Sequence, residues 1–153
     1  MKIKPIAFTV TSNKRLGLLT SPVNIYSTDK FNKDFKKKQD VYNALWDTGS
    51  SLTVISDTLA KELNLDVHGE LIADTAGGKI KANKYIISLS LPNRLNIENV
   101  MVSSGKLGPG IDILIGMDII GLGDFAISNV DNKTVFSFRF PSTKVIDFVK
   151  EEI

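Results

Sequence analysis

The residues with the clearest chemical potential are Asp47, Thr48 and Gly49, which follow an apolar run at residues 44–46. A carboxylate at the tip of a tight turn is held by backbone on both sides, and a neighbouring glycine allows the chain to bend sharply. Such a carboxylate can act as a general base toward water. Asp and Gly also favour plain turns, and a given Asp-Thr-Gly arises by chance in roughly 3% of chains of this length. The tripeptide alone therefore leaves catalysis and a structural turn both open.

The composition excludes several other kinds of catalytic and metal-binding site. The chain has no cysteine, which excludes disulfides, thiolate metal sites and cysteine nucleophiles. Its single histidine, His68, excludes any site that needs two imidazoles from one chain, and its loop-like surroundings place it at the surface. We therefore expect no metal site and no cofactor.

Length and composition indicate one domain that spans residues 1–153. The hydrophobic content of 42% and the charged content of 24% are ordinary for a globular protein. A net charge of +2, from 19 basic and 17 acidic residues, gives no strong field for a nucleic acid. No stretch resembles a signal peptide or a membrane span, so we expect a cytoplasmic protein with neither a nucleic-acid nor a membrane partner.

The elements that must position Asp47 are mainly strands. Short runs of aliphatic and β-branched residues alternate with turn residues, which predicts a mainly β domain. A short helix is predicted over residues 57–65, and the tail at residues 143–153 is either a second helix or frayed. The first two strands are expected to form a hairpin, as are the last two. Strands are predicted over residues 6–11, 16–26, 41–46, 51–56, 71–75, 80–91, 97–102, 111–115, 125–128 and 134–140.

Two small-residue turns lie between predicted strands downstream of Asp47. Ala76, Gly77 and Gly78 predict a hairpin whose tip can lie flat over a ligand and offer its amides, although a simple turn is the alternative. Residues 113–115 run into Gly116, which echoes the apolar run before Asp47. Each of these turns follows an apolar strand, and together they provide context for the Asp-Thr-Gly turn.

Three further features have both a structural and a functional interpretation. Asp118 is better explained as a helix cap or hydrogen-bond acceptor than as a second catalytic acid. Trp46 is expected in the core or in a cleft wall. The stretch at residues 27–40 is interpreted as a solvated loop rather than a nucleic-acid patch, because the whole-chain charge gives such a patch no support. Its aromatic and basic residues are Phe31, Phe35, Lys30, Lys33, Lys36, Lys37 and Lys38.

Residues 44–50, the glycine-tipped hairpin and residues 113–118 occur in the order typical of retropepsin-like aspartic proteases, and the chain resembles this family over residues 41–128. The resemblance implies a closed, mostly β retropepsin-like barrel with a flap hairpin and one or two short helices. It also implies that two chains pair about a twofold axis, each donating one aspartate. The resemblance implies that Asp47 is the catalytic residue. It also implies that Thr48 braces the paired turns, Gly49 offers its carbonyl to the substrate and Ser50 supports the site. Ile115 would line the pocket, and the flap tip would consist of Ala76, Gly77 and Gly78.

The chemistry of such a pair agrees with this interpretation. Two carboxyls held about 3 Å apart cannot both ionise, so they share a proton and supply a base and an acid together. Because the chain carries one Asp-Thr-Gly, the sequence predicts a homodimeric aspartic endopeptidase acting on polypeptides. Ser51 and Met117 replace the ion pair that braces retroviral dimers, and a hydrogen bond from Ser50 to the dyad predicts an acidic optimum.

Two other function classes stay open at this stage. A protease-like dimer can bind a peptide or protein partner without catalysing anything, since a fold does not guarantee activity. A nucleic-acid adaptor acting through Lys30 to Lys38 would require salt-dependent binding.

Overall fold

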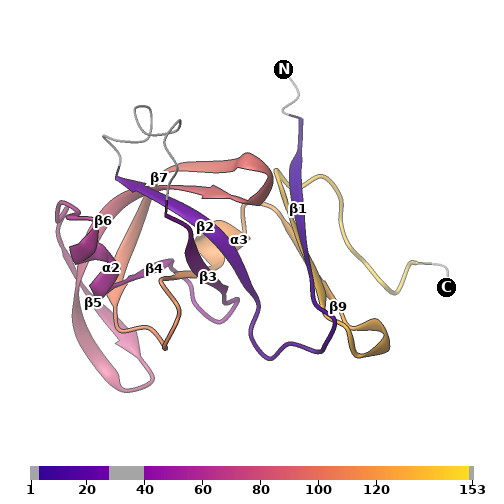
Figure 1. The fold of residues 1–153 in the computed structure, drawn as a ribbon, viewed down its shortest axis with the longest axis horizontal. Coiled ribbons are helices and arrows are strands. Elements are labelled where there is room, and N and C mark those ends of the chain that lie inside the picture. Colours follow the sequence, from indigo (N-terminus) through magenta and orange to yellow (C-terminus); the bar gives the residue numbers. More distant parts are fainter. Residues whose placement is uncertain (1–3, 28–39, 152–153) are drawn as a thin grey trace.

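The computed structural model describes residues 4–27 and 40–151, and the predicted mainly β fold is confirmed (Figure 1). The described residues form strands that belong to two sheets, with only short helices between them. The strands are β1 (Ile6–Thr11), β2 (Thr20–Ser27), β3 (Tyr42–Trp46), β4 (Val54–Ser56), β5 (Glu70–Thr75), β6 (Gly78–Leu91), β7 (Leu95–Gly105), β8 (Ile113–Ile115), β9 (Asp124–Ser128) and β10 (Val135–Phe140).

The larger sheet closes into a six-stranded barrel. Its strand order is β2-β3-β8-β4-β7-β6, and a further antiparallel pairing of β2 with β6 joins the two ends. Strand β5 lies outside this ring and pairs only with β6, as the second arm of a hairpin. Two strand pairs are parallel, β3 with β8 and β4 with β7, and the first of them brings the strand ends after Trp46 and Ile115 side by side. The barrel therefore sets the Asp-Thr-Gly turn next to Gly116.

The barrel interior supplies most of the core. Its strands alternate between the interior and the surface, as half-buried antiparallel strands do. Burial of one such aliphatic side chain stabilises the fold by about 1.5–3 kcal/mol relative to its exposure. The fully buried members include Ile55, Ile87, Leu89, Ile113 and Ile115.

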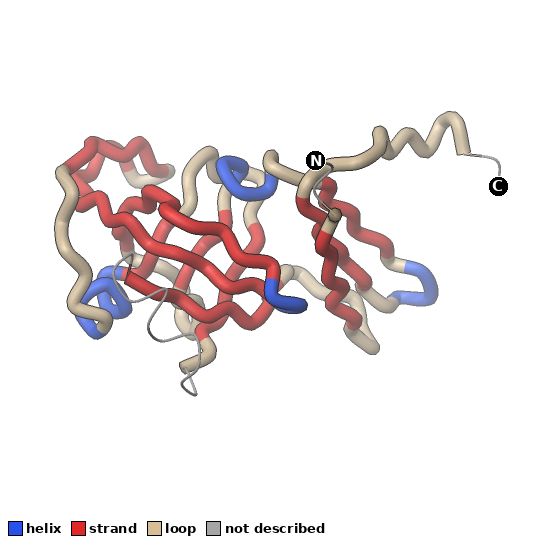
Figure 2. Tube along the Cα trace, turned by 90° about the horizontal axis from the view of Figure 1, so that it is seen from above, coloured by secondary structure: helices blue, strands red, loops and turns tan. Residues whose placement is uncertain are grey.

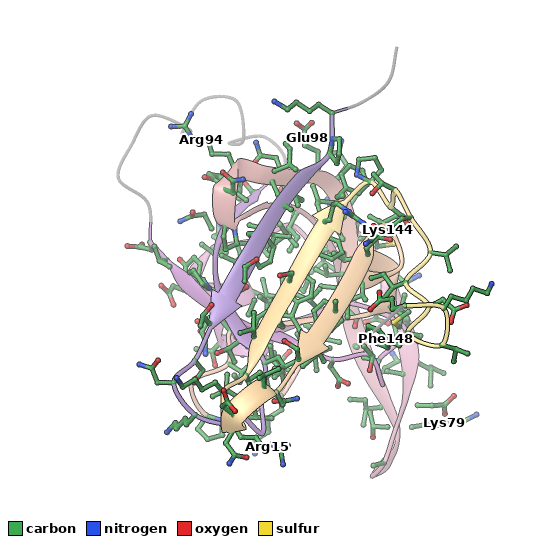
Figure 3. All side chains as sticks on the ribbon, turned by 90° about the vertical axis from the view of Figure 1, so that its right-hand side faces the viewer. Arg15, Lys79, Arg94, Glu98, Lys144 and Phe148 are labelled. Atoms are coloured by element: carbon green, nitrogen blue, oxygen red, sulfur yellow. The ribbon has the colours of Figure 1, made fainter. Side chains whose placement is uncertain are left out.

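The three strands β1, β10 and β9 form a separate antiparallel sheet, here called the terminal sheet (Figures 2 and 3). The predicted hairpin of the last two strands is confirmed, because β9 and β10 pair directly. The predicted hairpin of the first two strands is wrong. Strand β1 pairs with β10, whereas β2 pairs with β3 and β6 in the barrel.

The helices are short and depend on their caps. Helix α2 (Asp57–Glu62) begins at the Ser56 cap, whose hydroxyl accepts a hydrogen bond from the Leu59 amide at 3.1 Å. It ends before the predicted residue 65, because Asn64 turns into the left-handed region at φ 49°. Helix α3 (Met117–Ile120) follows Gly116. Two 3-10 turns, η1 (Pro92–Arg94) and η2 (Val130–Asn132), complete the set in the described part of the chain.

The helical alternative for the tail does not form, and most of the predicted loop lies outside the described residues. The tail forms no helix over residues 143–151; it runs beside the terminal sheet, where Figure 3 marks Lys144 and Phe148. Within the predicted loop at 27–40, residues 28–39 and their lysines lie outside the described residues. Among the described helices, none has the length and apolar character needed to cross a membrane.

Candidate active site

Asp47 lies directly after β3, at the start of a turn that backbone contacts fix on two sides. Its amide donates to the Ile115 carbonyl at 3.0 Å, and its own carbonyl accepts from the Ser50 amide at 3.2 Å. The carboxylate Oδ1 accepts from the Gly49 amide at 2.8 Å. The side chain is half-buried, whereas Thr48 and Gly49 are exposed. A carboxylate held in this way is oriented before any substrate arrives.

Gly49 and Ser50 control the immediate surroundings of this carboxylate. A Cβ atom on Gly49 would lie 3.0 Å from Asp47 Oδ1, so a side chain there would push against the acid. The Ser50 hydroxyl donates to the Leu52 carbonyl at 2.7 Å. Because a hydroxyl carries one proton, the hydrogen bond predicted from Ser50 to the dyad is not made in the single chain. Local competition from a nearby carbonyl accounts for this difference.

Helix α3 locks the far side of the turn. The Met117 amide donates to the Ser50 carbonyl at 2.8 Å, and the Asp118 amide donates to the Ser51 carbonyl at 3.2 Å. Gly116 permits this approach, because a Cβ atom there would lie only 2.5 Å from the backbone carbon and oxygen of Leu52. Gly116 therefore lets the turn pack closely against the start of α3, and no larger residue fits without moving backbone.

A second set of hydrogen bonds, between Thr53 and Asp118, fixes the segment that leaves the turn. The Asp118 carboxylate accepts from the Thr53 hydroxyl at 2.7 Å and from the Thr53 amide at 3.0 Å. The same hydroxyl accepts from the Gly116 amide at 3.1 Å, and Thr53 is fully buried. The interpretation of Asp118 as a hydrogen-bond acceptor is confirmed. Because these hydrogen bonds hold Thr53 outside the strand, β4 begins at Val54 instead of at the predicted residue 51.

The β5–β6 hairpin confirms the turn predicted at residues 76–78. Thr75 closes it, since its hydroxyl donates to the Gly78 carbonyl at 2.8 Å and accepts from the Gly77 amide at 3.2 Å. Gly78 has φ 110°, a conformation that favours glycine. The tip is exposed, and Figure 1 shows the hairpin at the lower left of the molecule, whereas β1 and β9 of the terminal sheet lie at the right.

One predicted site residue, Ile115, and the neighbouring Trp46 lie in the interior. The Ile115 side chain is fully buried, so it does not line a cavity in the single chain as expected. The parallel pairing of β8 with β3 turns it into the barrel core, and its contribution to the site is the carbonyl that accepts from Asp47. Trp46 is 5% exposed and belongs to the core, which was one of its two predicted placements.

Sequence reasoning did not find Thr53 or Ser21, which support the turn from inside. Thr53 bridges α3 to β4, and the Ser21 hydroxyl accepts from the Trp46 indole at 2.9 Å. A single buried hydroxyl gives no periodic signal, so only the three-dimensional contacts reveal these roles. In the described part of the chain, no group of three or more acidic or histidine side chains can hold a metal ion.

Sequence comparison with known families gives one decisive match. The family described as "Aspartyl protease" matches residues 33–119, which is more than half of the chain. The chain belongs to the aspartyl protease family. No curated protein matches its full sequence significantly.

The fold of this aspartyl protease resembles that of a solved retropepsin-like protease, and two further solved structures are similar at lower scores. A retropepsin-like aspartic protease from Rickettsia conorii has 16% identity and a TM-score of 0.56, covering 92% of this chain and 98% of that chain. The EIAV protease in complex with an inhibitor has 16% identity, a TM-score of 0.49 and coverage of 71% and 88%. The retroviral protease-like domain of Ddi1 from Leishmania major has 15% identity, a TM-score of 0.48 and coverage of 79% and 94%. The predicted retropepsin-like fold is confirmed, and the protein is an aspartic-type peptidase.

Proposed function

We propose that this peptidase is a homodimeric endopeptidase in which Asp47 of each chain supplies one of two catalytic carboxyls. The observation that carries the proposal is the turn itself. Its backbone hydrogen bonds to Ile115, Gly49 and Ser50 hold a single carboxylate at the end of β3. Rigid supports of this kind are what a site needs to keep reacting groups within about 0.5 Å of productive geometry.

A second carboxyl does not come from the same chain through Asp118. That side chain follows the corresponding apolar strand, but its two oxygens already accept three hydrogen bonds, from the Thr53 hydroxyl and amide and from the Ile119 amide. A carboxylate engaged in this way serves as a structural acceptor. The second carboxyl of the dyad therefore comes from Asp47 of another chain, which makes the homodimer a requirement of the mechanism.

The surface beside the turn supports such a pairing. Leu52 is 47% exposed and Met117 is 42% exposed, although both lie next to a turn that is otherwise held by hydrogen bonds. Apolar side chains that remain exposed around a functional site are typical of a protein interface. Ser51 and Met117 cannot form an ion pair, so apolar contact is the expected brace of the dimer.

The β5–β6 hairpin is proposed as a flap over a polypeptide substrate. Its register places Leu71, Ala73 and Ile80 on one face, and Glu70, Lys79 and Lys81 on the other. The charged face, which carries the Glu70–Lys81 ion pair at 3.1 Å, suits solvent. The apolar face then suits the substrate. The amides at Ala76, Gly77 and Gly78 can bond to an extended peptide backbone, together with the Gly49 carbonyl.

The proposed reaction needs no group beyond these residues and water. One Asp47 carboxylate takes a proton from water while the oxygen attacks the peptide carbonyl carbon, and the protonated Asp47 of the other chain gives its proton to the carbonyl oxygen. The resulting tetrahedral diol collapses when the C–N bond breaks: the first Asp47 carboxyl gives the proton it took from water to the amide nitrogen, and the second Asp47 carboxylate takes a proton from one diol hydroxyl. The pair returns to its singly protonated state, and each turnover consumes one water molecule.

The test combines a substitution with subunit mixing. Asp47→Asn should abolish hydrolysis of a peptide library, whereas Asp131→Asn on the exposed η2 turn should leave it unchanged. A mixture of equal amounts of parent and Asp47→Asn chains should have about a quarter of the activity of the same total amount of parent protein. Only one random pair in four carries both acids. Full activity of Asp47→Asn would refute the catalytic role, and half activity in the mixture would refute the shared site. Binding of a transition-state mimic without any turnover would favour the catalytically silent alternative.

A further inference from the structure

Trp46, the single tryptophan of the chain, immediately precedes Asp47 and is surrounded by phenylalanine rings. One of these rings, Phe125, stacks on the indole at 5.5 Å with an interplanar angle of 9°. The others are tilted against it, in the geometry that aromatic pairs favour. They are Phe138 at 5.1 Å, Phe8 at 5.7 Å and Phe136 at 6.3 Å between ring centroids.

The remaining freedom of Trp46 is removed by hydrogen bonds. The indole Nε1–H donates to the Ser21 hydroxyl at 2.9 Å, in a place where Ser21 is 2% exposed. The Trp46 amide donates to the Leu19 carbonyl at 2.9 Å. An indole that stacks on one face and bonds through its edge cannot rotate without losing contacts. The peptide unit that leads into Asp47 is therefore fixed.

The four phenylalanines that contact Trp46 come from strands of one sheet. Phe8 comes from β1, Phe125 from β9, and Phe136 and Phe138 from β10, so all of them belong to the terminal sheet. Trp46 belongs to β3 of the barrel. The indole is thus the point at which the terminal sheet contacts the strand that carries the catalytic turn.

We propose that Trp46 is a positioning residue of this peptidase, through which the terminal sheet sets the placement of the Asp47 carboxylate. The inference rests on the proposed function and adds a role for a sheet that contributes no side chain to the described turn. A displacement of about 1 Å in a catalytic group can reduce the rate about a hundredfold. Because one peptide bond separates the clamped indole from Asp47, movement of the ring is transmitted directly to the turn.

A purely structural aromatic core makes a different prediction. In that case, substitution of Trp46 would lower stability and the folded fraction but leave the rate constant of each folded, paired enzyme unchanged. The positioning role requires a fall in kcat of the folded enzyme. KM should stay nearly constant, since the buried indole contacts no substrate.

The first experiment compares Trp46→Leu, Trp46→Phe and Leu89→Ala, with kcat counted per site titrated by a transition-state mimic. Trp46→Leu should lower kcat at least tenfold with KM within twofold of the parent. Trp46→Phe keeps an aromatic ring and should recover most of that loss. Leu89→Ala removes a fully buried side chain from β6, a strand that does not pair with β3, and should lower stability without changing kcat. An unchanged kcat in both Trp46 variants would overturn the proposal.

The second experiment asks whether the terminal sheet acts through the indole. Phe125→Leu on β9 should lower kcat about threefold in the parent and have no further effect in a Trp46→Leu background, because both changes break one path. Independent, multiplicative effects would overturn the proposal. If Trp46→Leu does not fold, the same cycle is measured with Trp46→Phe.

A third measurement does not depend on turnover. Amide hydrogen exchange at Asp47 and Gly49 should accelerate at least tenfold in Phe125→Leu while exchange in β6 stays the same. Equal protection of the turn in parent and variant would overturn the proposal. An active Asp47→Asn enzyme would refute the proposed function, whereas an inactive Asp47→Asn with an unaffected Trp46→Leu refutes only this inference.

Discussion

At the scale of single residues, Gly116 is the position with the least tolerance. A methyl group there would overlap the Leu52 backbone, and a third backbone atom, the Ser50 carbonyl oxygen, lies 3.0 Å away. Overpacking of this kind costs about 1–3 kcal/mol, and backbone on the other side cannot yield as a flexible side chain does. Gly116→Ala should therefore lower the free energy of unfolding by that amount in denaturant titrations and reduce activity. Gly108→Ala, where the added atom meets nothing within 4 Å, is the matched control.

Thr53 is the second sensitive residue, because its hydroxyl accepts from Gly116 and donates to Asp118 at once. Thr53→Val keeps the shape but leaves a buried amide and a carboxylate oxygen without this partner, which costs about 1–3 kcal/mol. Thr53→Ser retains the hydroxyl and should lose about 0.8 kcal/mol for the missing methyl. Denaturant unfolding of the three proteins separates the two effects. Equal stability of the Val and Ser variants would contradict the bridging role.

At the scale of elements, the C-terminal tail is joined to the terminal sheet through Asp124. Hydrogen bonds from the Ser142 hydroxyl, the Thr143 amide and Arg139 lower the pKa of Asp124 from 3.8 to about 2. An acid with a lowered folded-state pKa contributes stability above its unfolded pKa and loses it as the pH falls through the folded value. The tail should therefore stay attached throughout the mildly acidic range and be released only between about pH 4 and pH 2.

Asp124→Asn tests this connection directly. The variant should melt at a lower temperature than the parent at pH 7 and pH 5, and the difference should disappear as the pH approaches 2. Limited proteolysis at pH 5 should cut the tail faster in the variant. A difference in melting temperature that is the same at every pH would show that the carboxylate charge contributes nothing to the attachment.

Some of these elements could be predicted from the sequence and others could not. The strands on either side of Asp47, the β5–β6 hairpin and helix α2 follow from local alternation, turn residues and a serine cap, so they were predictable. The hairpin expected from the first two strands fails because β1 pairs with β10, whose register joins Ile6 to Phe140 across almost the whole chain. Local patterns carry no information about such long-range partners. The burial of Ile115 and the hydrogen bond from Ser50 to Leu52 were not predictable for a related reason, since the orientation of each side chain depends on a neighbouring strand or carbonyl.

At the scale of the whole molecule, the barrel and the terminal sheet contact each other through the aromatic cluster around Trp46 and through a hydrogen bond from the Asn93 side chain to the Ala7 carbonyl. The barrel holds the Asp47 turn through β3, β8 and α3, and the terminal sheet contacts the residue before this turn, Trp46. The interface proposed for the second copy lies on the barrel side, at Leu52 and Met117. The support of Asp47 and the surface proposed for dimerisation therefore lie on different parts of the chain.

The apolar character of that surface predicts how the dimer responds to solution conditions. Attraction between exposed charges is screened by salt, whereas apolar burial is not weakened by it. The dissociation constant of the dimer, measured by sedimentation, should therefore change less than threefold between 0.1 and 1 M NaCl, and specific activity should fall when the protein is diluted below this constant.

Met117→Lys places a hydrated ammonium in the interface and should weaken association at least tenfold, because burial of an unpaired charge is costly. Val130→Lys, on a side chain that is 72% exposed on η2, is the control and should leave association unchanged. Tenfold weaker pairing of the parent in high salt would instead assign the brace to charged groups elsewhere on the chain.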